Sequence, residues 1–169
     1  IMRGYEKRFS VPRKLKIPLT PALLLLLVKY FYLEQHDDLI IWCAAATAVY
    51  LLLRKSEFLV TASQSVPLLQ RRFWRGVKAD QGTLYIAASK VDVFKQGATL
   101  QVFRLGVSTW PFGTIIVAMQ AAAHKNPEAP LFQMKDGSAL SNKVFTVKIK
   151  DALRQLQEAS LSVSFEEQG

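Results

Sequence analysis

Cysteine and histidine are scarce in this chain. Its 169 residues include one cysteine, Cys43, and two histidines, His36 and His124, which stand far apart. One thiol cannot form an intramolecular disulfide, and isolated Cys and His residues lack the spacing of a zinc or other metal site. We therefore expect no metal site, surface positions for both histidines, and an intracellular compartment, where cysteines stay reduced.

Several enzyme motifs are missing as well. The sequence has no glycine-rich phosphate loop and no nucleophile elbow of the Gly-x-Ser-x-Gly type, the motifs that hold nucleotide phosphates or present a catalytic serine. A nucleotide hydrolase and a metal-dependent nuclease are therefore poorly supported. No motif indicates a cofactor.

The composition is that of a folded, basic protein. Half of the residues are hydrophobic and 21% are charged, with 22 Lys and Arg against 13 Asp and Glu, a net charge of +9. A chain of this length suits one domain with a sizeable core. The excess of cations indicates a polyanionic partner, either nucleic acid or an anionic membrane surface. Because the chain opens with Ile1, we expect a piece of a longer protein.

The first 20 residues differ from the rest. Pro12 and Pro18 interrupt any helix there, and the segment contains six cations but only one acid, Glu6. Residues 1–20 are therefore predicted to be an extended basic arm or linker, which either follows a phosphate backbone or is simply solvated. The domain proper is predicted to span residues 21–169.

Two apolar helices are predicted next. Thr20-Pro21 is typical of a helix start and predicts a helix to about Leu33, and Asp37-Asp38 opens a second helix that continues to Arg54. A membrane hairpin is the alternative. However, Lys29 interrupts the first apolar run and the second is short, whereas a spanning helix needs about 20 residues. Buried core helices are favoured, and no membrane is expected.

From Val66 onward the pattern changes to a period of two, which is typical of strands. Strands are predicted over residues 72–78, 83–89 and 99–104, with turns at 80–82 and 95–97. They should form a three-stranded antiparallel meander. The cations on or near this meander are Arg71, Arg72, Arg75, Lys78, Lys90, Lys95 and Arg104.

Helices return in the last third of the chain. Trp110-Pro111 begins a predicted helix that fades at residues 124–127, Asp136-Gly137 predicts a tight turn, and Ser141 caps a further helix through Leu156. No element is assigned after Ser160. The predicted fold class is α+β, mainly α, with a small three-stranded antiparallel sheet.

Arg54 and Glu57 stand at the end of the second apolar run. A guanidinium at the edge of an apolar element, with a carboxylate one helical turn away to orient it, can form a rigid phosphate clamp. Taken alone, an Arg-x-x-Glu pattern is most often a solvated ion pair.

Five segments of the chain, one of which contains Arg54 and Glu57, resemble motifs of a single protein family. The stretch 50–58 resembles the "GFLRxSEF" segment of tyrosine recombinases, also called phage-type integrases, and most closely of the eukaryotic Crypton and DIRS-like transposon branch. Segment 89–97 resembles their "SKTDxFxxG" hairpin, with Val91 where Thr is usual. Residues 103–111 resemble the strand end and "TxCP" helix start, 130–141 the "PLFxxxDGxPLT" turn, and 18–21 the opening "PITP".

The resemblance implies a helical catalytic domain for DNA integration or site-specific recombination. Such enzymes cut DNA with a tyrosine hydroxyl, through a 3′-phosphotyrosyl intermediate, without metal or cofactor. By resemblance, Arg54 would bind the scissile phosphate, Lys90 would be the general acid, and Glu57 would orient Arg54. The surrounding cations would contact the DNA backbone, mostly without reading sequence: Arg71, Arg72, Arg75, Lys78, Lys95 and Arg104. The resemblance also implies a homo-oligomer on DNA, and the nucleus as its location in a eukaryotic cell.

The sequence departs from the family near its end. Where the family reads "GHSFRIGAA", Val163 stands for the histidine and Glu166 for the second arginine, and all five tyrosines precede Lys90. The chain as given therefore lacks its nucleophile. Three hypotheses remain open: a truncated or decayed recombinase, a non-catalytic DNA-binding module of the same fold, and the membrane hairpin.

Overall fold

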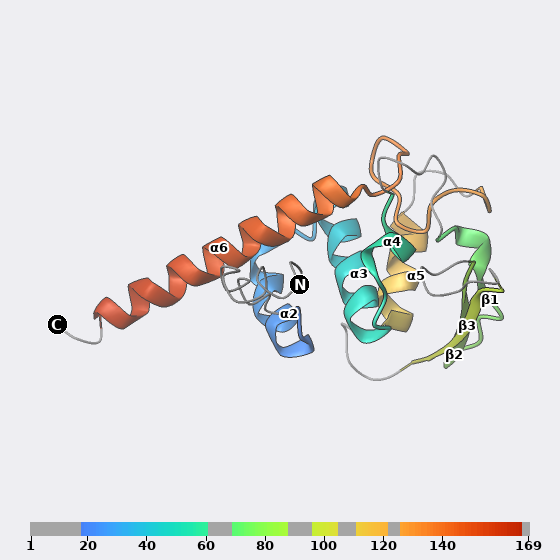
Figure 1. Ribbon diagram of the computed structural model, residues 1–169, viewed down its shortest axis with the longest axis horizontal. Helices are drawn as coiled ribbons and strands as arrows, with labels where there is room; N and C mark the ends of the chain where they lie inside the picture. Colours follow the sequence, from blue (N-terminus) through green and yellow to red (C-terminus); the bar gives the residue numbers. More distant parts are fainter. Residues whose placement is uncertain (1–17, 61–68, 88–95, 105–110, 122–125, 167–169) are drawn as a thin grey trace, which may run out of the picture.

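The computed structural model describes residues 18–60, 69–87, 96–104, 111–121 and 126–166. Helices form one side of the molecule and a three-stranded sheet lies at the end opposite the C-terminal half of the last helix (Figure 1). The class is α+β with a small antiparallel sheet, as the sequence predicts. Residues 1–17, most of the predicted basic arm, lie outside the described residues.

The first helix begins where the sequence predicts. In α2 (Pro21–Leu27), the Thr20 hydroxyl accepts a hydrogen bond from the Leu23 amide at 3.2 Å, which satisfies one of the amides that a helix start leaves without a partner. The helix is shorter than predicted, because the chain tightens into a 3₁₀ turn, η1 (Val28–Tyr30), and becomes extended at Phe31.

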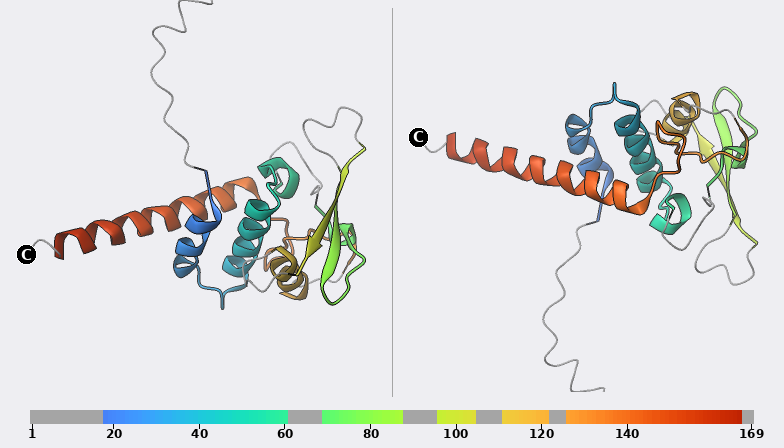
Figure 2. Two further views of the ribbon diagram at one scale, coloured as in Figure 1. Left: turned by 90° about the horizontal axis from the view of Figure 1, so that it is seen from below. Right: turned by 90° about the horizontal axis from the view of Figure 1, so that it is seen from above.

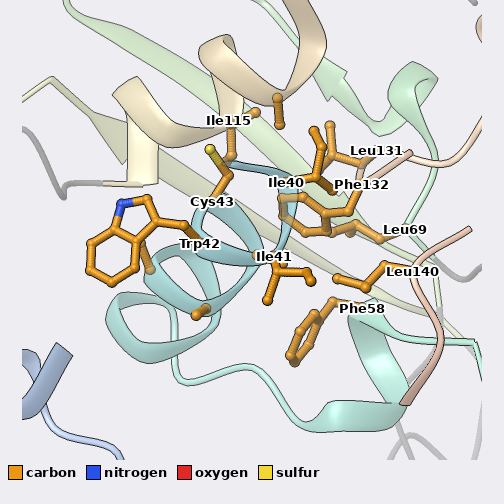
Figure 3. Close-up of a cluster of buried hydrophobic side chains, with 14 of the residues drawn as sticks. Ile40, Ile41, Trp42, Cys43, Phe58, Leu69, Ile115, Leu131, Phe132 and Leu140 are labelled. Carbon is orange, nitrogen blue, oxygen red and sulfur yellow. The ribbon is translucent and has the colours of Figure 1, made fainter. Parts of the chain in front are cut away.

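The second helix, α3 (His36–Tyr50), forms the centre of the core. It is buried on nearly all sides between residues 40 and 47. Against α3 packs α5 (Pro111–Ala121), and the hydroxyls of Thr47 and Thr114 lie 3.1 Å apart across this contact. An apolar run that is buried all round predicts a core helix as readily as a membrane helix, and here the surrounding protein covers it (Figure 3).

α3 ends four residues before the predicted end at Arg54. The Leu53 amide donates to the Ala48 carbonyl at 2.9 Å, and Leu52 between them has φ +53°. This is the hydrogen bond of a Schellman motif, which ends helices and usually has glycine at the left-handed position. Because Leu52 and not glycine stands at this position, the sequence did not indicate the helix end. A separate short helix, α4 (Lys55–Phe58), follows.

The predicted meander is confirmed, with different strand lengths. The sheet has the order β1 (Trp74–Arg75), β2 (Gln81–Ile86), β3 (Ala98–Phe103), with antiparallel neighbours. β1 is shorter than predicted because a 3₁₀ turn, η2 (Arg71–Phe73), precedes it and Gly76 with φ +60° follows it. β2 begins inside the predicted turn at 80–82.

The last helix is longer than predicted. α6 (Asn142–Glu166) begins after Ser141, whose hydroxyl accepts from the Val144 amide at 3.2 Å, and continues past Leu156 through the stretch that the sequence left unassigned. Its N-terminal part lies against α2 and η1, and its C-terminal half extends beyond them (Figure 2). The turn at Asp136-Gly137 is confirmed, with the Ser138 amide donating to the Asp136 carboxylate at 2.8 Å.

Candidate nucleic-acid interface

Arg54 lies at the N-cap of α4, with its backbone held from both directions. The Glu57 carboxylate accepts from the Arg54 amide at 2.8 Å, and the Glu57 amide donates to the Arg54 carbonyl at 2.8 Å. Glu57 is 8% exposed, whereas Arg54 is an exposed residue. Glu57 therefore acts on the main chain of Arg54, a contact that the sequence spacing of three residues allows but does not specify.

Aromatic packing anchors this corner. The Phe58 ring meets the Phe145 ring edge to face at 5.4 Å between centroids and the Phe132 ring at 6.4 Å. Phe145 comes from α6 and Phe132 from the segment before it, so residues distant in sequence hold α4 in place. Figure 3 labels Phe58 and Phe132 in this cluster. Such pairs are favourable beyond their burial alone.

Two of the predicted site residues, Lys90 and Lys95, lie outside the described residues. By sequence they belong to the connection between β2 and β3. The structure therefore neither joins Lys90 to Arg54 nor separates them.

Four predicted DNA-contacting cations are exposed on and around the sheet: Arg72, Arg75, Lys78 and Arg104. Three hydrogen bonds to backbone carbonyls involve Arg75 and Arg104. The Arg75 Nε donates to the Arg72 carbonyl at 2.7 Å. The Arg104 amide donates to the Asp80 carbonyl at 2.6 Å, and its Nη1 donates to the Ala79 carbonyl at 3.5 Å. The exposed pair between Arg72 and Glu128, at 2.7 Å, leaves Arg72 accessible and contributes little stability.

Arg71 does not belong with these exposed cations. It is 8% exposed, and its Nη2 donates to the Met119 carbonyl of α5 at 2.9 Å. Burial lowers the pKa of its guanidinium from the ordinary value. The predicted DNA contact would need an exposed side chain, but η2 turns the residue inward, so that Arg71 lies on the inner side of the sheet.

Other titratable groups have structural partners. Lys148 of α6 pairs with Asp38 at 2.7 Å and lies over the Phe31 ring, which ties α6 to the start of α3. His36 is half-buried, with Nε2 3.0 Å from the Gln133 carbonyl, instead of the predicted surface position; His124 lies outside the described residues. Burial raises the pKa of the Cys43 thiol to about 12, which leaves it without a nucleophilic thiolate.

Among the described residues no group of three or more His, Cys, Asp or Glu could hold a metal ion. No helix in that part of the chain is both long and apolar enough to cross a membrane. No family model matches the sequence, and comparisons with curated proteins and with solved structures also return no match.

Proposed function

We propose that the chain is a DNA-binding domain of the tyrosine-recombinase type, whose ancestral role is DNA integration or site-specific recombination. The observation that carries this proposal is the Arg54 corner. An exposed arginine has its backbone held by a buried glutamate three residues later, at the position where the family motif has its first arginine. Four exposed cations on the sheet side and a net charge of +9 support the same partner.

In this proposal Arg54 contacts a phosphate of the DNA. A fixed guanidinium stabilises charge on nonbridging phosphate oxygens, and a backbone already held in place loses less entropy on binding. Lys90, in the connection between β2 and β3, would be the general acid toward the departing 5′ oxygen. Arg72, Arg75, Lys78 and Arg104 would contact the backbone without reading sequence.

The residues expected for the chemistry are where the chain departs from the family. Val163 and Glu166 replace the expected histidine and second arginine, and a glutamate would repel the phosphate. These replacements favour a second candidate function, a non-catalytic DNA-binding module of the same fold. Strand cleavage would require that another chain supply the missing groups, including the tyrosine.

Duplex binding measured over a salt series tests the shared part of both candidates. We expect the logarithm of the association constant to fall linearly with the logarithm of salt concentration, with a slope of about −0.9 for each phosphate contact. Arg54→Ala should weaken binding and reduce this slope by about one contact. Arg154→Ala is the matched control, because Arg154 is an exposed arginine on α6 paired with Asp151 at 3.1 Å. Equal losses in the two variants would reduce Arg54 to a general contribution to charge.

A strand-cleavage assay separates the two candidates. A nicked duplex that traps a covalent protein–DNA adduct should give no adduct with this chain alone, and binding without adduct is the result expected of the module. An adduct that disappears in Lys90→Ala, while duplex affinity is retained, would establish a working recombinase site.

A further inference from the structure

A pocket of about 360 Å³ lies between the sheet and α5, outside the Arg54 corner. Its lining residues are Arg71, Trp74, Val77, Ile116, Met119 and Gln120. Val77 and Gln120 are exposed and form its rim, whereas Arg71 and Trp74 are 8% and 5% exposed and form its inner wall. Neither the proposed DNA contact nor the core requires such a pocket.

The buried charge of Arg71 is incompletely compensated. Its Nη2 has the Met119 carbonyl as acceptor, but its Nη1 is buried and has no hydrogen-bond partner. Within the described ranges, no carboxylate lies within ion-pair distance of this guanidinium. A buried cation without a counterion is costly, and lowering of its pKa by burial reflects that cost.

A second unsatisfied donor lies in the same wall. The Trp74 Nε1 is buried and has no acceptor. The indole cannot easily turn to find one, because its ring packs edge to face on Phe112 at 5.7 Å between centroids and its six-membered ring lies directly over Gly82. Buried tryptophan N–H groups usually have a partner, so this one marks a position where an acceptor is missing.

We propose that this pocket binds a carboxylate carried on an apolar group. The carboxylate would accept from Arg71 Nη1 and Trp74 Nε1 and neutralise the buried guanidinium, while Val77, Ile116 and Met119 would contact the apolar part. Both nitrogens are shielded from water in the free protein, so side chains that line the pocket must move to admit the ligand, and Met119 and Gln120 among them are unbranched. Such side chains adapt readily.

A DNA phosphate fits this pocket poorly. Each phosphate of DNA has charged phosphates on both sides along the backbone, and these stay in solvent. The pocket walls beside the two donors are apolar. The carboxylate site is therefore independent of the proposed DNA contact, and either can fail without the other.

The indole N–H of Trp74 reports directly on the pocket. In a ¹H–¹⁵N spectrum of the whole chain, assigned with Trp74→Phe, we expect 4-phenylbutyrate to shift this resonance with half-saturation on the order of 1 mM. Its primary amide, of the same shape but neutral, should shift it far less. A peptide with an apolar C-terminal residue and a free carboxylate, compared with its C-terminal amide, tests whether the carboxylate comes from a protein chain or a small molecule.

Substitution of Arg71 completes the test. Arg71→Met keeps the length of the side chain without its charge and should weaken phenylbutyrate binding about tenfold or more, whereas Arg75→Met, an exposed neighbour, should leave it unchanged. Duplex binding should be the same in Arg71→Met and the parent. The proposal is overturned if acid and amide shift the Trp74 resonance equally, if inorganic phosphate matches phenylbutyrate, or if neither free acid has an effect.

Discussion

Two arginines of this chain have opposite environments. Arg54 is exposed, and its main chain is held by the carboxylate of Glu57. Arg71 is buried, its guanidinium has one carbonyl acceptor, and one of its nitrogens has no partner. An exposed guanidinium on a fixed main chain suits a large anion that arrives from solvent, because little desolvation is required. A buried guanidinium suits a small anion that can enter the pocket and replace the lost solvation.

The two arginines show that the role of a residue depends on its surroundings, even where the sequence predicts the same role for both. Both arginines were predicted to contact phosphate. The two arginines differ in burial. The free energy of holding the charge therefore differs too, since the effect of a charge depends on how far it is removed from water. Four substitutions probe these two regions and the helix end next to Arg54.

The largest expected effect comes from removing the aromatic anchor of the Arg54 corner. Phe58→Ala deletes a ring that is 5% exposed and packs on Phe132 and Phe145. It should lower the free energy of unfolding by about 3–5 kcal/mol, measured by urea denaturation. Phe103→Ala, at a 48% exposed position on β3, should cost no more than about 0.5 kcal/mol. Similar costs in both variants would mean that the cluster does not hold α4.

The next effect acts on the Arg71 region alone. A Cβ added at Gly82 would lie within 3 Å of the Trp74 ring, so Gly82→Ala should cost about 1–3 kcal/mol and shift the Trp74 indole resonance. Gly113→Ala in α5 is the matched control, because nothing lies within 4 Å of its added Cβ, and alanine is the better helix former, so it should gain up to about 1 kcal/mol. If Gly82→Ala changed Arg54-dependent duplex binding, the two regions would not be independent.

A smaller effect separates charge from geometry at the Arg54 corner. Glu57→Ala removes the acceptor for the Arg54 amide and should cost about 0.5–2 kcal/mol in stability, whereas Glu57→Gln keeps an oxygen there and should cost less. Both variants add one unit of positive charge, which by itself strengthens DNA binding. Weaker duplex binding by Glu57→Ala than by Glu57→Gln would therefore report on the position of Arg54. Tighter binding by both would show that charge alone matters.

The smallest effect is a gain. Leu52 has φ +53° and is 87% exposed, so Leu52→Gly relieves the left-handed conformation and loses few contacts. We expect a gain of a few tenths to about 1 kcal/mol by thermal unfolding, since the greater freedom of glycine in the unfolded chain offsets part of it. Leu51→Gly, at φ −93°, should be destabilising instead. A loss in Leu52→Gly would indicate that the exposed leucine makes a contact of its own.

Local signals predicted several features correctly. Thr20-Pro21 and Ser141 marked two helix starts, the acidic pair Asp37-Asp38 marked the beginning of α3, and the period of two gave the antiparallel meander. Errors arose where the signal was weak or absent: the Schellman motif at Leu52 contains no glycine, and η2 shortened the first strand. For the candidate site, the sequence predicted which residue types take part. It did not predict that Arg71 is buried and Arg54 exposed.

By itself the sequence determined the fold class, the net charge and the Arg-x-x-Glu spacing, because capping, periodicity and composition act over neighbouring residues or over the chain as a whole. Only the tertiary structure decided which cations face solvent and which donors lack a partner. Arg71 is buried because α5, some 40 residues later in the chain, covers the inner side of the sheet and provides the Met119 carbonyl. Burial and hydrogen-bond partners depend on contacts between distant segments, which no local pattern contains.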